Sequence, residues 1–423
     1  SGSVQAQAAV HQVADALQTL GLNVGMIPVQ VPHWVRGGAD AAIVRYTGQP
    51  SGVHQPLVVT ALGNSPATPA EGLTAPVLIV DSYDALQAHA QQVAGHIVLF
   101  NVPFNQQLAD AGYGATAYAR VLDYRLHGPA AAARLGAVAA LVRDASGAKA
   151  RLPHTGSTVW PEGITQIPAA SITAEDCDLV AALAAKGPVD VHLLLTPRTL
   201  PPVKSSDVIG DLRGTVHPDQ VVVVSGHLDS WDLGTGAQDD GAGVAVAMGV
   251  AAVLHQLDLH PRRTLRVVAW ADEENGLAGA RAYRQAMAAS INQHVAAIEN
   301  DTGAGRPFGI AAQITPDSMS LLSPVFDALA RMGVTILTRS LQPVASDIAP
   351  LDDAGVPGFA PIVDMREYFD IHHSAADTLD KVKPENLRRQ VAVDAVLAWW
   401  LANADPLPRI PAVVYASDLR HSD

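Results

Sequence analysis

The spacing of apolar positions divides the chain into three segments. Near the N-terminus a helical spacing ends at Gly21, with apolar residues at Val10, Val13, Leu17 and Leu20, which predicts a helix. An extended piece, "VGMIPVQVPHWVRGG", follows. From about residue 47 to about residue 200, short apolar strands such as "APVLIVD" and "GHIVLFN" alternate with Pro/Gly turns and Ala-rich helical stretches. We therefore separate residues 1–46, 47–200 and 201–423.

The third segment alternates strands and helices regularly. The predicted strands are "QVVVVSG", "TLRVVAWADEE", "HVAAIEND" and "GFAPIVDM", and the predicted helices include "GAGVAVAMGVAAVLHQL" and "PENLRRQVAVDAVLAWWLA". Such alternation is typical of crossover units that place helices on both faces of a parallel sheet. The expected fold is α/β, a three-layer sandwich with a mainly parallel central sheet. Trp399 and Trp400 on the last helix are interpreted as core or interface residues.

Composition excludes several classes of protein. Apolar residues make up 48% of the 423 residues and charged residues 16%, which indicates a globular chain with a large core, of two domains by length. The net charge of −14, with no basic run, argues against nucleic acid and anionic membranes as partners. No uninterrupted apolar window approaches the roughly 18 residues of a membrane span. The single cysteine, Cys177, excludes an intramolecular disulfide and is interpreted as a small buried apolar residue.

Histidines and carboxylates follow each predicted strand of the third segment. They are His227 and Asp229, then Asp239 and Asp240 in a Gly-rich loop, Asp272 to Glu274, Glu299 and Asp301, and finally His372 and His373. Loops that follow parallel strands open on one edge of the sheet, so these carboxylates should converge and require a cation. Imidazole and carboxylate ligands without thiolate favour Zn²⁺, Mn²⁺ or Co²⁺. Residues 47–200 contain no comparable cluster. His154 is interpreted as a loop histidine with a structural or surface role, and a contact with the site is the alternative.

These motifs resemble those of the M28 metallopeptidases, and particularly their carboxypeptidase Q-like branch. The resemblance is carried by "GHLDSWDLGTGAQDDGAG", "RTLRVVAWADEENGLAGA", "IENDTG" and "YFDIHHSAADT", and by "VPHWVRG" and "PHTGS" in the first half. It implies a peptidase domain made of residues 1–46 and 201–423, with a β-rich protease-associated domain inserted at 47–200. It further implies that the protein is secreted or periplasmic and a homodimer.

The resemblance also implies a site with two Zn²⁺ per chain, with Co²⁺ or Mn²⁺ as alternatives. His227 and Asp301 would bind one metal, Glu274 and His373 the other, and Asp239 would bridge them. Asp229 would orient the ring of His227, and Glu273 would be the general base for a metal-bridged water. Asp240 is interpreted as a helix N-cap. Substrate contacts are assigned to His372, Arg366, Ser346 and Asp347.

The expected activity is hydrolysis of small peptides, mostly dipeptides with a free N-terminus. Two other peptidase activities stay open, an aminopeptidase for longer peptides and a glutamate carboxypeptidase-like enzyme. A different class, a receptor-like binding protein without a working metal site, is disfavoured because all five candidate ligands and Glu273 are present.

Overall fold

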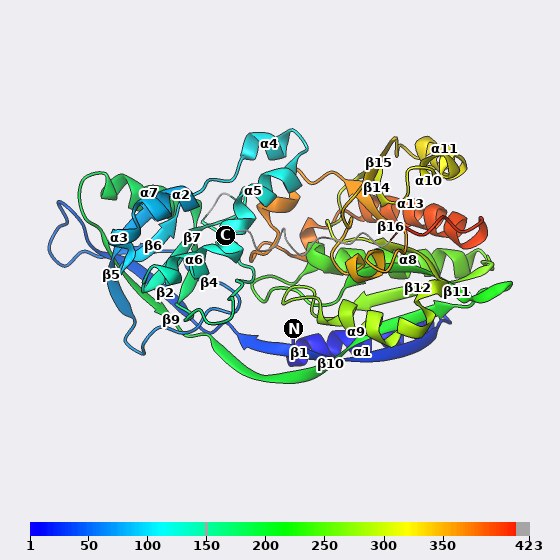
Figure 1. The fold of residues 1–423 in the computed structure, drawn as a ribbon, viewed down its shortest axis with the longest axis horizontal. Coiled ribbons are helices and arrows are strands. Elements are labelled where there is room, and N and C mark those ends of the chain that lie inside the picture. Colours follow the sequence, from blue (N-terminus) through cyan, green and yellow to red (C-terminus); the bar gives the residue numbers. More distant parts are fainter. Residues whose placement is uncertain (149–150, 412–423) are drawn as a thin grey trace.

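A computed structural model describes residues 1–148 and 151–411, and within them the chain forms two eight-stranded sheets (Figure 1). Residues 149–150 and 412–423, which fall in the second and third predicted segments, lie outside the described residues. The strand order of the first sheet is β1 (Asn23–Val35), β10 (Arg198–Leu212), β12 (Arg263–Trp270), β11 (His217–His227), β13 (His294–Glu299), β16 (Gly358–Val363), β14 (Pro307–Gln313) and β15 (Ile336–Ser340).

The first sheet is mixed, whereas the sequence predicted a mainly parallel one. Its centre, from β12 through β11 and β13 to β16, is parallel. On one side β1 and β10 pair antiparallel with each other, and β10 pairs antiparallel with β12. On the other side β14 is antiparallel to β16 and parallel to β15. The difference arises because β10, β14 and β15 were not recognised as strands in the sequence.

Helices cover both faces of this sheet because successive strand residues point to opposite sides. Val222 and Val224 face the core under α1 (Val4–Thr19), α8 (Ala242–Gln256), α11 (Ser323–Arg331) and α13 (Pro384–Asn403). Val221 and Val223 face the core under α9 (Ala278–Ala286) and α12 (Ala349–Asp352). Trp399 and Trp400 pack against the first of these cores, as expected.

The segment Ala237–Gln256, which contains α8, is a membrane-span candidate by length and composition. Its most apolar stretch is 61% buried inside the protein. Val246, Ala247 and Val250 are fully buried, and α8 packs on α13 and on β11. These contacts identify α8 as a core helix.

The second sheet lies between β1 and β10 in the chain. Its order is β3 (Gln55–Leu57), β2 (Ala39–Arg45), β9 (Asp190–Leu195), β5 (Leu73–Val80), β6 (Ile97–Phe100), β7 (Ala139–Arg143), β8 (Ala169–Ile172) and β4 (Val59–Ala61). Its helices are α2 (Tyr83–Ala88), α3 (Ala90–Val93), α4 (Gln106–Asp110), α5 (Gly114–Leu126), α6 (Gly128–Arg134) and α7 (Ala174–Ala184). Figure 1 shows this unit beside the first sheet, with the long strands β1 and β10 running toward it.

The second unit begins earlier than the segment 47–200 suggested. Strand β2 pairs with β3 and β9, so residues 39–45 lie with the second sheet and not with the first. Cys177 on α7 is fully buried, and burial raises the pKa of its thiol, in agreement with its interpretation as an apolar core residue.

The core beside β13 contains a buried titratable group, His294. Its Nε2 lies 2.8 Å from the Tyr283 hydroxyl and its Nδ1 lies 3.3 Å from the carbonyl oxygen of Ser290. Burial, helped by the positive charges of Arg266 and Arg409, lowers the pKa of His294 to about 4. The ring is therefore neutral in the folded protein at neutral pH.

We expect His294 to make the fold less stable in mild acid. An unfolded histidine has a pKa of about 6.5, so between pH 6.5 and 4 the unfolded state binds more protons and stability falls as the pH falls. The loss attributable to His294 is about 2 kcal/mol at pH 5 relative to pH 8. Urea unfolding of the wild type and of His294→Gln, which cannot titrate, measures it at both pH values. A pH dependence that is the same in both proteins would contradict this assignment.

Candidate metal centre

The five predicted ligands lie at or after the ends of four strands of the first sheet, β11, β12, β13 and β16. His227 is the last residue of β11, Glu274 follows β12, and Asp301 follows β13. Asp239 lies in the turn η1 (Ala237–Gly241) that leads into α8, and His373 follows β16 and the short helix η3 (Tyr368–Asp370). The topology therefore brings all five to one edge of the sheet, as the sequence predicted.

Asp239 lies between two histidines. Its Oδ1 is 3.2 Å from Nε2 of His227, which is also 3.3 Å from Oδ1 of Asp301. Its Oδ2 is 3.1 Å from Nε2 of His373, which is also 3.0 Å from Oε2 of Glu274. Two groups of possible metal-ligating atoms thus share one carboxylate, and the atoms of each group lie within 4.8 Å of one another.

Neighbouring carboxylates fix the loop that carries Asp239. Asp377 accepts the backbone N–H groups of Gln238, at 2.7 Å, and of Asp239, at 3.2 Å. Asp240 accepts N–H groups of His227 and Gly243, each at 3.0 Å, so it ties the first turn of α8 to β11. The N-cap of α8 is Gly241 and not Asp240, which corrects the predicted capping role.

Steric crowding explains why Gly243 stands at the start of helix α8. A Cβ at Gly243 would lie 2.1 Å from the carbonyl oxygen of Asn300, so no larger residue fits where α8 begins.

Charge is concentrated at this edge. Burial and the neighbouring acids raise the pKa of Glu273, Glu274 and Asp301 above their ordinary values, although His227 and His373 partly oppose the shift. Burial alone would raise the pKa of Asp239 too, but the facing imidazoles outweigh it and hold that pKa well below its usual range. Carboxylates in this arrangement need a positive charge among them.

The residues present fit a metal ion. His227 Nε2, Asp239 Oδ2 and Glu274 Oε1 are buried and form no hydrogen bond with any described residue, although Nε2 and Oδ2 lie close to oppositely charged partners. Buried polar atoms are nearly always satisfied, so unsatisfied atoms that point at a common space indicate a ligand there. The donor set of imidazole nitrogen and carboxylate oxygen suits Zn²⁺ and related divalent ions.

Backbone carbonyl groups orient both histidines. Nδ1 of His227 lies 2.9 Å from the carbonyl oxygen of Asp229, and Nδ1 of His373 lies 3.2 Å from that of Thr155. An Nδ1–H that His227 donates in this way leaves its Nε2 free as a metal ligand, while Nδ1 of His373 lies 3.2 Å from Nη1 of Arg125 as well as near Thr155. The sequence assigned the orienting role to the side chain of Asp229, but its carboxylate stays 3.8 Å from the ring and instead accepts the N–H of Glu273 at 3.0 Å.

The second sheet unit contributes side chains to the site through His154 and Arg125. His154, interpreted as a loop histidine with a structural or surface role, is buried against His372, with Nε2 3.3 Å from its Nδ1. Arg125 on α5 donates to the carbonyl oxygen of Thr155 at 3.0 Å and to the Tyr118 hydroxyl at 2.7 Å. The "PHTGS" motif was the only signal in the sequence for this contact. A single histidine, with no second histidine or carboxylate at the spacing of a metal site, does not indicate that it lies against His372.

A cavity of about 380 Å³ opens over the ligands. Asp239, Glu274, Asp301 and His373 line it together with Glu273 and His372. Its other wall comes from the second unit and carries Ala115, Tyr118, Leu122 and Arg125 of α5. Glu273 is partly exposed there, in reach of a bound molecule.

The other candidate substrate contacts lie elsewhere. Ser346 donates to Asp301 at 3.2 Å and so supports a candidate ligand. Asp347 is fully buried and donates its backbone N–H to Glu299. Arg366 pairs with Asp364 and lines a separate hollow of about 660 Å³. Among the four candidates, His372 therefore lies best for contact with a molecule in the cavity.

The chain is similar to known peptidases. The profile described as "Peptidase family M28" matches residues 207–398. Carboxypeptidase Q of Mus musculus is 34% identical over 412 residues, covering 97% of this chain and 84% of that protein. The crystal structure of a Peptidase M28 precursor from Shewanella amazonensis SB2B has a TM-score of 0.89 at 36% identity, covering 97% and 91% of the two chains. Aminopeptidase from Aneurinibacillus sp. strain AM-1 shares the fold, with a TM-score of 0.66 at 20% identity and coverage of 97% and 92%.

A fold shared with peptidases and a cluster of imidazoles and carboxylates define an enzyme of the metallo-exopeptidase class. The chain belongs to peptidase family M28, which confirms the resemblance seen in its sequence.

We expect Asp239→Asn to lose bound metal from both groups of ligands. The change removes the one carboxylate that the two groups share, while the Asp377 and Asp240 contacts that hold the loop remain. Elemental analysis of purified protein measures the metal content per chain. Asp347→Asn is the control, because this buried acid belongs to neither group and should keep the wild-type content. Full metal content in Asp239→Asn would disprove the shared role.

We expect Trp231→Phe to weaken metal binding without unfolding the protein. The indole Nε1 donates to Oε2 of Glu274 at 2.5 Å, and loss of such a supporting hydrogen bond typically costs about 10–100-fold in metal affinity. Competition with a chelator gives the affinity. Trp34→Phe is the matched control, since its Nε1 donates to the Ser65 carbonyl oxygen and not to a ligand. Equal affinities in the two variants would refute the role of Trp231.

Proposed function

We propose that the protein is a dinuclear zinc exopeptidase that hydrolyses small peptides, foremost dipeptides with a free N-terminus. The observation that carries this proposal is the position of the Asp239 carboxylate, whose two oxygens face two different histidines. One carboxylate shared by two ligand groups suits two cations about 3.5–4 Å apart. The names of two similar proteins, carboxypeptidase Q and aminopeptidase, agree with removal of terminal residues.

The metal ions would polarise the peptide carbonyl and make a coordinated water more acidic. Glu273 then takes a proton from the attacking water and delivers it to the leaving amine. Its position supports this role, because Glu273 lines the cavity while the side chain of Asp229 accepts its backbone N–H. His372 lines the same cavity and is assigned a contact with the substrate.

The walls of the cavity favour a short peptide. Helix α5 of the second unit lies across from the ligands, so a long peptide chain would meet Tyr118 and Leu122. Arg125 is the one Arg or Lys among the described residues that line the cavity. Its guanidinium already donates to Tyr118 and Thr155. A pocket for an acidic C-terminal residue would need free arginines, which disfavours a glutamate carboxypeptidase-like activity.

Three further proposals rest on the family resemblance alone. They are that the second sheet unit is a protease-associated domain, that the protein is secreted or periplasmic, and that it forms a homodimer.

The substrate proposal is tested with a panel of peptides on zinc-loaded protein. The panel contains free and N-acetylated dipeptides, a tripeptide, a longer peptide and a peptide with C-terminal Glu. Rapid cleavage of free dipeptides alone supports the proposal. Equal cleavage of longer peptides identifies an aminopeptidase, and cleavage of N-blocked substrates at a C-terminal Glu identifies a carboxypeptidase.

We expect Glu273→Gln to lower kcat about 10²–10⁴-fold, the usual contribution of a general base, because glutamine cannot accept the proton. Metal content and KM should change little, since Glu273 belongs to neither group of ligands. Steady-state kinetics on a free dipeptide, together with metal analysis, measures both. Glu274→Gln is the contrasting variant and should lose metal. If the two variants show the opposite pattern, base and ligand have been exchanged in our assignment.

A further inference from the structure

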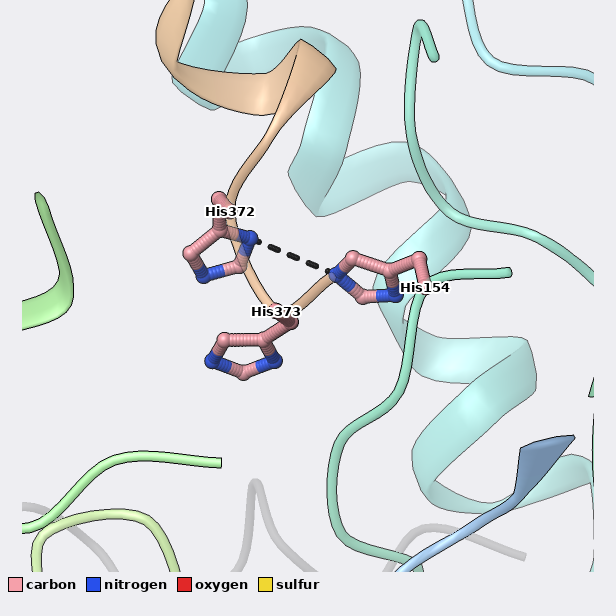
Figure 2. A group of neighbouring side chains, drawn as sticks. All are labelled: His154, His372 and His373. Atoms are coloured by element: carbon pink, nitrogen blue, oxygen red, sulfur yellow. Dashed lines mark hydrogen bonds between the residues drawn. The ribbon is translucent and has the colours of Figure 1, made fainter. Parts of the chain in front are cut away.

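His154 reaches the site from the second sheet unit. Its side chain is 1% exposed, and its Nε2 lies 3.3 Å from Nδ1 of His372 (Figure 2). The ring of Tyr118 meets both rings edge-on, with centroids 5.7 Å from His154 and 5.1 Å from His372. The two imidazoles are therefore held in fixed orientations.

The cluster of His154, His372 and His373 is not arranged as a further metal site, although its nitrogen atoms lie close together. The rings of His372 and His373 stack at 3.7 Å with an interplanar angle of 20°, and those of His154 and His373 stack at 18°. Imidazole lone pairs lie in the plane of the ring, so stacked rings do not direct them at one ion. His373 is also engaged through Nε2 with Asp239 and through Nδ1 with Thr155.

A hydrogen bond between His154 and His372 can run in two directions, and the surroundings decide between them. If His372 donated from Nδ1, a neutral His154 would carry its proton on Nδ1. That atom is buried and has no hydrogen-bond partner among the described residues, so the N–H would be orphaned. In the same arrangement the bare Nε2 of His372 would face Oδ2 of Asp239 at 3.4 Å, one acceptor against another.

The opposite direction of this hydrogen bond leaves no buried N–H of His154 or His372 without an acceptor. His154 donates from Nε2 to Nδ1 of His372, and Nδ1 of His154 carries no proton. His372 then carries its proton on Nε2, which faces the carboxylate of Asp239, a residue that lines the same cavity as His372. A bare ring nitrogen costs less when buried than an N–H without an acceptor.

We propose that His154 is a positioning residue that fixes His372 as the Nε2–H tautomer, so that this N–H is offered to the carbonyl oxygen of a peptide in the cavity. This inference rests on the proposed peptidase function. A preorganised donor aimed at an oxygen that gains negative charge lowers the barrier to attack. The second sheet unit thereby takes part in the chemistry and does not only cover the site.

The tautomers can be measured without any activity. Selective ¹⁵N labelling of histidine in otherwise deuterated protein, with and without zinc, distinguishes protonated from bare ring nitrogens, and His154→Gln and His372→Phe assign the signals. We expect Nδ1 to be bare and Nε2 protonated in both His154 and His372. Protonated Nδ1 in His372 would overturn the inference, whether or not the protein proves to be a peptidase.

Kinetics tests the consequence. His154→Phe keeps a flat buried ring but has no donor, and should lower kcat about 10–100-fold, the usual range for supporting residues, with KM and metal content retained. His154→Gln places an amide N–H near the Nε2 position and should recover most of the loss. In a His372→Phe background, His154→Phe should cost nothing more, because the two residues act through one hydrogen bond.

Additive losses in the double variant, or equal losses in the Gln and Phe variants, would show a merely structural role and overturn the inference. A wild-type protein that binds no metal or cleaves no peptide would instead refute the proposed function, and the tautomer measurement would still decide the role of His154.

Discussion

The structure depends on one buried carboxylate, Asp239, held between two imidazoles at an edge crowded with acids. Its two oxygens face His227 and His373, and the carboxylates of Asp240, Glu274 and Glu299 nearby are buried as well. Such an arrangement is unstable unless backbone and charge are placed together, because each uncompensated buried charge costs several kcal/mol. The loop contacts from Asp377 and Asp240 and the close approach of α8 to β13 at Gly243 supply that placement.

The edge of the first sheet that carries the candidate ligands also contacts the segment that links the two sheets. Arg36, just after β1, is buried between Trp34 and Trp231, with its guanidinium 5.2 Å and 5.5 Å from their rings. It donates to Thr155 Oγ1 at 2.9 Å and to the carbonyl oxygen of Ala61, both in the second unit, while Trp231 donates to Glu274. A buried cation with several acceptors resists displacement. The position of the second unit is thus coupled to the hydrogen bonds that surround the ligands.

The sequence predicted the parallel centre of the first sheet and the ligand edge because both have local signals. Val221 to Val224 form a continuous apolar run, and His227 follows it directly. Strand β10 was missed because Pro and polar residues interrupt its apolar pattern, "RTLPPVKSSDVIGDL". The role of Asp229 could not be predicted in this detail. Its spacing of two residues from His227 does not tell whether its carbonyl oxygen or its carboxylate contacts the imidazole.

The contacts of His154 and Thr155 could not be predicted from spacing, because they join residues more than 200 positions apart. They exist because β1 and β10 pair along their length and so return the inserted unit to the edge where β11 and β16 end. The Thr155 carbonyl oxygen meets Nδ1 of His373, and the Thr155 N–H donates to the His373 carbonyl oxygen at 2.8 Å. Two hydrogen bonds of opposite direction fix both the ring and the backbone of that residue. The orientation of one predicted ligand is therefore set by a chain segment in the other sheet, which makes the two units a single site.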